Sequence, residues 1–222
     1  DALSGPSVLA NRTILITAGP TREPIDAVRF IANRSSGRMG FAIAAAAAMA
    51  GARVTLIAGP SALPTPAGVT RVDVQTALEM HSATLSRAEA ADILVAAAAV
   101  ADYRVAEPAT GKVKKTDAPP SLQLTPNPDI VRDVAAMPDA PFTLGFAAET
   151  DDLIHHAQGK LNAKGLDMIA ANRVGDGLGF EVDDNQLEVI WNGGGATLGP
   201  MPKRQLATAL IKLLGEHWHA AR

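Results

Sequence analysis

The sequence predicts an α/β fold with a doubly wound, mostly parallel sheet that is flanked by helices. Three observations support this prediction: short apolar runs alternate with helical segments, several runs are apolar throughout, and 47% of the 222 residues are hydrophobic. Strands that are apolar throughout are covered on both faces, and strands that alternate with helices form parallel crossover units. A chain of this length can bury one sizeable core.

The expected elements follow one another in a regular order. We expect strands at 12–17, 53–58 and 69–74. We also expect strands at 92–97, 142–146 and 167–171, each of which is a short apolar run bounded by polar or turn residues. Helices are expected to open at 35–40 and to cover 76–90 and 203–219. Segments 179–182 and 186–191 flank the polar residues 183–185 and predict a C-terminal antiparallel hairpin. We interpret residues 12–222 as a single domain and residues 1–11 as a linker or the start of a fragment.

The composition argues against several classes of function. The formal net charge is -3 and the pI is near 5.9, whereas a duplex-binding surface needs a basic face. The absence of cysteine excludes disulfides, thiolate zinc sites and cysteine nucleophiles. The alanine-rich run 42–50 is too short to span a bilayer, and no signal peptide is visible. We therefore expect a cytoplasmic protein that binds neither nucleic acid nor a membrane.

A candidate anion site follows the first predicted strand. Gly19 ends that strand, and Ser35, Ser36, Gly37 and Gly40 open the next helix. The first amides of a helix have no partner within it and lie at its positive end, and glycine lets a phosphate approach the backbone closely. We expect these residues to form a phosphate-binding loop, although the same residue types also start helices that pack closely on a sheet.

Two other interpretations stay open. A nicotinamide-dependent oxidoreductase would use a similar sheet, but the usual dinucleotide fingerprint does not fit and no carboxylate follows the strand at 53–58. A non-catalytic nucleotide-binding or assembly module would keep the pocket without the chemistry. Preference for another nucleotide over NAD would exclude the first alternative, and loss of turnover on mutation of the site would exclude the second.

Several polar residues are candidates for contacts with a nucleotide. Segment 112–115 places three lysines within four residues, a pattern that usually marks a solvated loop but here follows a buried strand. Asn127 is expected to cap a helix that has Pro128 at its first position. Lys160 and Lys164 share one helix face. The histidines at 155, 156, 217 and 219 lack a supporting ligand set, so no zinc site is predicted.

A resemblance to bacterial phosphopantothenoylcysteine synthetase rests on seven features in order along the chain. They are AGPTREPID, RFIANRSSGRMG, AAVADYR, KVKK, NPDIV, GFAAET and the spacing of Lys160 and Lys164. The resemblance runs from about Thr13 to at least Asn172. It implies a Rossmann-like sheet and a CTP-dependent phosphopantothenate-cysteine ligase, the ligase half of the bifunctional coenzyme A biosynthesis protein.

The resemblance also implies a reaction and the residues that carry it. The carboxylate of 4′-phosphopantothenate would attack the α-phosphate of CTP, and the amine of L-cysteine would then displace CMP from the acyl-cytidylate. Lys112 would act as a mobile cation at the α-phosphate, Asn33 would hold the acyl-cytidylate, and Arg29 would lie beside it. The implied CTP site comprises Ala96, Ala97, Ala98, Asp102, Lys112, Pro128, Asp129, Ile130, Val131, Phe146, Lys160 and Lys164.

The remaining implications concern the metal and the partners. Mg²⁺ is expected with the nucleotide, held mostly by the triphosphate and water, so no protein ligand is assigned. A homodimer is expected in which the partner completes the active site, with the C-terminal hairpin as a candidate dimerising element. In the full-length chain we expect fusion to a flavin-dependent decarboxylase half. For the present chain no flavin is predicted.

Overall fold

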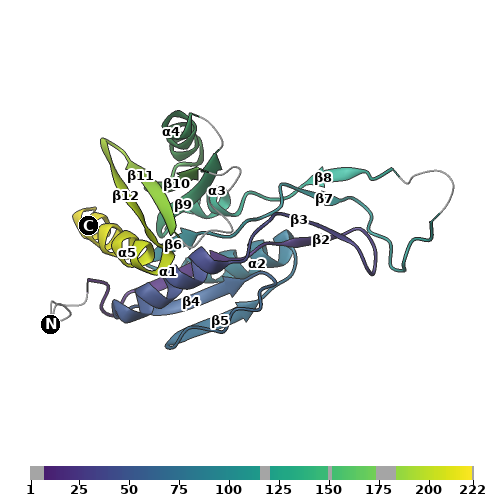
Figure 1. Ribbon diagram of the computed structural model, residues 1–222, viewed down its shortest axis with the longest axis horizontal. Coiled ribbons are helices and arrows are strands. Elements are labelled where there is room, and N and C mark those ends of the chain that lie inside the picture. The colour runs from purple at the N-terminus through teal and green to yellow at the C-terminus, as the bar shows by residue number, and fades with distance from the viewer. Residues whose placement is uncertain (1–7, 116–120, 150–151, 174–183, 222) are drawn as a thin grey trace.

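The computed structural model describes residues 8–115, 121–149, 152–173 and 184–221. Their main feature is an eight-stranded sheet of order β5-β4-β1-β6-β9-β10-β11-β12 (Figure 1). Neighbouring strands are parallel from β5 to β10, and β11 and β12 add an antiparallel pair at one edge. The predicted doubly wound fold with a C-terminal hairpin is therefore confirmed.

The six parallel strands of this sheet agree closely with the predicted strands, whereas the strand at 194–202 was not predicted. The chain moves outward from β1 through β4 to β5 and then returns to β6 on the other side of β1, so the winding reverses between β1 and β6. Ligands of such sheets bind outside the carboxyl ends of the strands at this reversal. The strands are Thr13–Ala18 (β1), Arg53–Ala58 (β4), Val69–Asp73 (β5), Ile93–Ala96 (β6), Phe142–Glu149 (β9), Met168–Arg173 (β10), Asp184–Trp191 (β11) and Gly194–Pro202 (β12).

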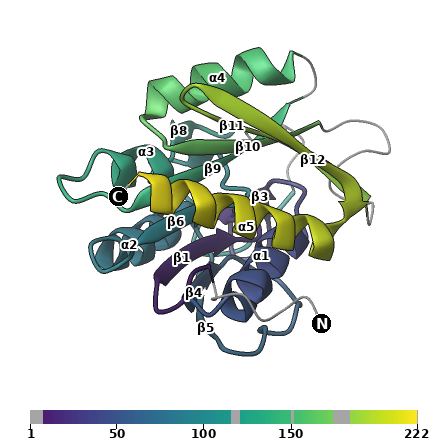
Figure 2. The ribbon, with the colours of Figure 1, turned by 90° about the vertical axis from the view of Figure 1, so that its left-hand side faces the viewer.

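Among the described residues, five helices cover the two faces of the sheet. Helices α1 (Arg38–Met49) and α5 (Lys203–Ala220) pack side by side on one face, which Figure 2 shows. Helices α2 (Ala77–Ala88), α3 (Ile130–Ala135) and α4 (Leu153–Lys164) cover the other face. Within the described residues, no helix is both long and apolar enough to cross a bilayer.

Two short hairpins project together from the body of the protein and form an arm that the sequence did not predict. One hairpin pairs Arg22–Pro24 (β2) with Phe30–Ala32 (β3), and the other pairs Tyr103–Val105 (β7) with Leu124–Pro126 (β8). Figure 1 shows both extending away from the main sheet. We call the described residues within 22–32 and 103–126 the arm. Each strand has only three residues, too few to produce a recognisable alternation of apolar and polar residues.

The position of the C-terminal hairpin turn differs from the prediction. The turn lies at Asn192 and Gly193, where Gly193 has a φ of 86°, and Trp191 pairs with Gly194 across it. Glycine suits the second central position of this turn because it adopts a positive φ at little steric cost. The predicted turn residues Asp184 and Asn185 instead belong to β11, and segment 179–182 lies outside the described residues.

The start of α3 also differs from the prediction. Asp129 rather than Asn127 is the N-cap, because its Oδ1 accepts a hydrogen bond from the Arg132 amide at 3.3 Å. Asn127 lies further from the helix and donates from Nδ2 to the Ala101 carbonyl at 2.8 Å. Pro128 consequently precedes the cap rather than occupying the first helical position. Either side chain could cap a helix, so the sequence alone did not decide between them.

Candidate functional site

The glycine-rich start of α1 lies against the loops that follow β1 and β4. Gly37, the N-cap of α1, has a φ of 78°, and a Cβ there would lie 3.3 Å from the Gly19 Cα. A Cβ on Gly40 would lie 2.5 Å from the Ala18 Cβ. These two approaches show that the glycines let the helix pack directly on the backbone at the end of β1. Close packing therefore explains Gly37 and Gly40 even without a ligand.

A pocket opens at this helix start, beside the reversal of the sheet. The predicted phosphate-loop residues Ser35, Ser36, Gly37 and Gly40 line it, together with the predicted nucleotide contacts Ala97 and Phe146. The structure thus brings the proposed anion loop and part of the proposed CTP site to one place. Of the other lining residues, Arg38 and Met39 lie within the predicted loop, and Ala99, Ala147 and Ala148 lie beside the predicted contacts. Sequence analysis did not single out Asn172, Asn185, Leu187 and Lys203.

The sequence contained a usable pattern for one of these unpredicted residues but not for the others. Asn172 lies directly after the apolar run 167–171, so the rule that ligands bind at strand ends could have found it. Asn185 and Lys203 reach the pocket from β11 and from the first residue of α5. Their placement depends on the register of the C-terminal hairpin, and the turn that sets this register was predicted at the wrong residues. No local pattern identified them.

The alanines at the end of β6 and directly after it are held against β1. The Ala97 amide donates to the Thr17 carbonyl at 3.1 Å, and the Ala98 amide lies 3.4 Å from Thr17 Oγ1. Ala96 pairs with Thr17 in the parallel register. Both amides are therefore already used as donors. In this arrangement the carbonyl oxygens are the better candidates to read a nucleotide base.

A second group of predicted residues gathers around the start of α3. Lys164 Nζ forms an ion pair with Asp129 Oδ2 at 2.9 Å, which links α4 to the N-cap of α3. Ile130 is buried and Val131 is half-buried, so both act as packing residues on this face. Lys160, one turn before Lys164, is exposed. This group lies on the α3 and α4 face of the sheet, whereas Phe146 packs on the α1 face.

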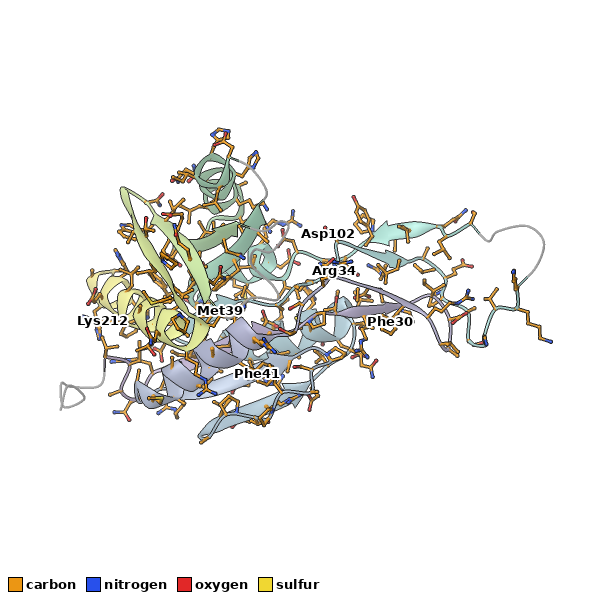
Figure 3. All side chains as sticks on the ribbon, viewed as in Figure 1. Phe30, Arg34, Met39, Phe41, Asp102 and Lys212 are labelled. Atoms are coloured by element: carbon orange, nitrogen blue, oxygen red, sulfur yellow. The ribbon has the colours of Figure 1, made fainter. Side chains whose placement is uncertain are left out.

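The arm carries two of the three predicted catalytic residues. Arg29 lies in the β2–β3 turn and Lys112 lies in the segment after β7, neither of which lines the pocket of the same chain. The third, Asn33, lies at the junction of arm and body and donates from Nδ2 to the Val100 carbonyl at 2.9 Å. Figure 3 labels Arg34 and Asp102, which lie at this junction. Within one chain, the structure does not bring Lys112 to the glycine-rich loop.

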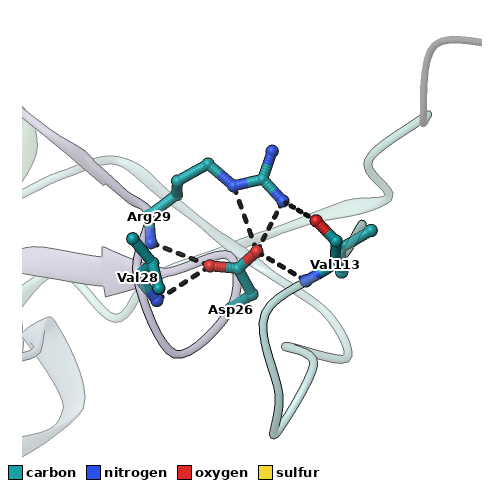
Figure 4. A network of polar contacts seen from close by, with 4 residues as sticks. All are labelled: Asp26, Val28, Arg29 and Val113. Carbon is teal, nitrogen blue, oxygen red and sulfur yellow. Dashed lines mark hydrogen bonds and ion pairs between the residues drawn. The ribbon is translucent and has the colours of Figure 1, made fainter. Parts of the chain in front are cut away.

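Arg29 forms a close ion pair with Asp26, a residue that sequence analysis did not single out. Arg29 Nε and Nη2 both donate to Asp26 Oδ2, at 3.0 and 2.5 Å, and the amides of Val28 and Arg29 donate to Asp26 Oδ1 at 2.8 Å (Figure 4). The Arg29 guanidinium, followed by these amides, holds the pKa of the Asp26 carboxyl far below its ordinary value. The same contact raises the pKa of Arg29. The only sequence signal was an acid three residues before an arginine.

The described residues contain no group of three or more histidine, aspartate or glutamate side chains placed to hold a metal ion. His155 and His156 are exposed on α4, and the His217 ring lies 4.1 Å from the Trp191 ring, centroid to centroid.

Residues 9–217 match the family described as the DNA/pantothenate metabolism flavoprotein C-terminal domain. The chain belongs to this family. It is 51% identical over 215 residues to the coenzyme A biosynthesis bifunctional protein CoaBC of Vibrio cholerae, covering 95% of this chain and 54% of that protein. For CoaBC of Escherichia coli K12 the identity is 48% over 208 residues, covering 91% and 51%. The chain thus spans about half the length of these curated relatives.

Solved structures of the family show which half of these relatives the chain resembles. The crystal structure of the C-terminal domain of CoaBC superposes with a TM-score of 0.83 at 35% identity, covering 96% of this chain and 99% of that domain. The family resemblance predicted from sequence is therefore confirmed. A Streptococcus pneumoniae DNA/pantothenate metabolism flavoprotein shares the fold with a TM-score of 0.80 at 23% identity, covering 93% of this chain and 99% of that one.

Proposed function

We propose that this chain is a CTP-dependent ligase that joins 4′-phosphopantothenate and L-cysteine in coenzyme A biosynthesis. A carboxylate oxygen of 4′-phosphopantothenate bonds to the α-phosphorus of CTP as the bond to pyrophosphate breaks. The cysteine amine then bonds to the acyl carbon and loses a proton, while the bond to CMP breaks. The observation that carries this proposal is the similarity along nearly the whole chain to the C-terminal domain of CoaBC.

The pocket at the start of α1 supports binding of a phosphorylated substrate. Its lining combines the helix start, Arg38 and Lys203, which offer amides and positive charge. Cytosine would lie near Ala96–Ala98, where backbone carbonyls can accept from its exocyclic amine. Phe146 would form an apolar wall. Lys160 and Lys164 would neutralise phosphate charge, Lys164 after leaving Asp129, and Mg²⁺ would be held mostly by the triphosphate and water.

The arm is the element that fits a second copy of the chain. Most of the exposed large apolar side chains of the described residues lie on the arm. They are Val28, Phe30, Tyr103, Val113, Leu122 and Leu124. Such a concentration is typical of a protein interface. The C-terminal hairpin extends the main sheet instead, so we now favour the arm as the dimerising element. Lys112 of one copy would then reach the pocket of its partner.

The proposed chemistry needs positioning and charge neutralisation more than a protein nucleophile. Lys112 would stabilise the negative charge that develops at the α-phosphate, and Asn33, held at Val100, would present the acyl-cytidylate to cysteine. Arg29 would support both from the arm. In the full-length chain a flavin-dependent decarboxylase half would supply a neighbouring step, and the protein would act in the cytoplasm.

A half-reaction experiment tests this proposal. The protein is incubated with Mg²⁺, CTP and 4′-phosphopantothenate, and pyrophosphate and CMP are followed before and after cysteine is added. We expect pyrophosphate first, and CMP with the amide product only after cysteine. Lys112→Gln should slow pyrophosphate release, whereas Asn33→Asp should slow the cysteine step. Absence of CTP consumption by a folded dimer would favour the binding-module alternative, and reduction of NAD would favour the oxidoreductase.

A further inference from the structure

We propose that Asp26 is a positioning residue that fixes the backbone beside Lys112, through a clasp made of Asp26, Arg29 and Val113. The inference rests on the proposed role of Lys112 in CTP chemistry. It adds a residue outside the predicted site and gives Arg29 a defined task. Figure 4 shows the three residues in contact.

The clasp holds both main-chain groups of Val113. The Val113 amide donates to Asp26 Oδ2 at 3.1 Å, and the Val113 carbonyl accepts from Arg29 Nη2 at 3.2 Å. One ion pair on the β2–β3 turn therefore binds the segment after β7 as a neighbouring strand would. Because these contacts use main-chain atoms, they fix the path of the chain next to Lys112 whatever side chain position 113 carries.

A second contact bounds the short loop that carries Lys112. The Ala109 amide donates to the Ile25 carbonyl at 3.0 Å, four residues before Val113. Residues 110–112 are thus held at both ends by the same turn. Lys112 is exposed, so its backbone is anchored while its ammonium group can reach outward. This is the arrangement expected of a cation that must meet a ligand on another surface.

The burial of Asp26 indicates that the clasp fixes how the two hairpins are arranged. The Asp26 side chain is fully buried although it lies on an arm outside the main core, while the Arg29 side chain is 48% exposed. Taking a carboxylate out of water is unfavourable, and a buried ion pair often contributes little net stability. Such pairs can instead specify one arrangement of the chain. Here the arrangement is that of the two hairpins around Lys112.

A double-mutant cycle separates positioning from a general structural role. Pyrophosphate release from CTP and 4′-phosphopantothenate is measured for the wild type, Asp26→Asn, Lys112→Ala and the double variant. We expect Asp26→Asn to slow release at saturating CTP by about 100-fold, since a misplacement of about 1 Å can have this effect. The KM for CTP should change less. In the Lys112→Ala background, Asp26→Asn should have no further effect.

Matched controls and a second measurement keep the inference testable. Glu107→Gln removes an exposed acid from the same arm and should leave release unchanged. Equal slowing by Asp26→Asn with and without Lys112 would overturn the inference, as would wild-type rates in Asp26→Asn. If the wild type itself releases no pyrophosphate, the proposed function fails instead. Hydrogen exchange then tests the clasp alone: amides of 109–113 should exchange roughly tenfold faster in Asp26→Asn, and unchanged exchange refutes it.

Discussion

Substitution of Gly40 by alanine tests whether the start of α1 depends on direct contact with β1. The added Cβ would lie 2.5 Å from the Ala18 Cβ and 3.2 Å from the Ala18 Cα, and it would meet the Thr17 carbonyl oxygen at 3.4 Å. Carbon atoms pack at about 3.5–4.0 Å, so the helix must move by roughly 1 Å or more. Such overpacking costs about 1–3 kcal/mol, here about 2–3 kcal/mol because the Ala18 Cβ cannot rotate away, and the better helix propensity of alanine offsets about 1 kcal/mol. We therefore expect a net loss of about 1–2 kcal/mol.

Gly159 provides the matched control because it is also helical, but a Cβ there would meet nothing within 4 Å. Thermal unfolding at one protein concentration should show a fall of roughly 2–8 °C for Gly40→Ala. Gly159→Ala should instead be stabilised by about 0.5–1 kcal/mol. Wild-type stability in Gly40→Ala, or equal destabilisation in both variants, would refute the packing explanation. Binding of CTP should weaken only in Gly40→Ala, because the displaced helix start lines the pocket.

Other changes test the helix cap, the core and the clasp. Asp129→Ala removes the N-cap of α3 and the partner of Lys164, so urea titration should show a loss of about 0.5–2 kcal/mol, against no change for exposed Asp139→Ala. Leu210→Ala, fully buried on α5, should lose about 2–5 kcal/mol by the same titration. Because the pKa of Asp26 is lowered by folding, the contribution of its ionised form is complete above the ordinary carboxyl pKa and declines as the pH falls below about 4. The protection of the 109–113 amides, measured as the exchange rate relative to the intrinsic rate at each pH, should fall only in that acidic range, and a loss of protection between pH 5 and 7 would contradict the assignment.

The main sheet could be predicted from sequence because its central strands are largely buried on both faces. Segments 53–58 and 92–97 are mainly apolar, apart from Arg53, Thr55 and Asp92, and the structure places strands at Arg53–Ala58 and Ile93–Ala96. The phosphate-loop residues at 35–40 were also placed correctly beside the end of β1, because helix-starting residues and glycine spacing are local signals. Their role in binding phosphate stays a prediction.

The arm and the far side of the pocket could not be predicted in the same way. Strands of three residues give no clear alternation, and their stability depends on contacts between β2 and β7 that are distant in sequence. Asn185 and Lys203 reach the pocket only through the correct hairpin register. The clasp is likewise long-range, since Val113 lies 87 residues from Asp26. Burial of Asp26 results from that pairing and is invisible in a local pattern.

The central claim, that the carboxylate of the substrate is activated at the α-phosphate of CTP, is tested most directly by isotope transfer. 4′-Phosphopantothenate with ¹⁸O in its carboxylate is converted with CTP, Mg²⁺ and L-cysteine, and the products are weighed by mass spectrometry. If an acyl-cytidylate forms, one labelled oxygen leaves with the cytidine, so CMP gains one ¹⁸O and pyrophosphate gains none. Label in inorganic phosphate accompanied by CDP, or amide formation with unlabelled CMP, would contradict the proposed mechanism.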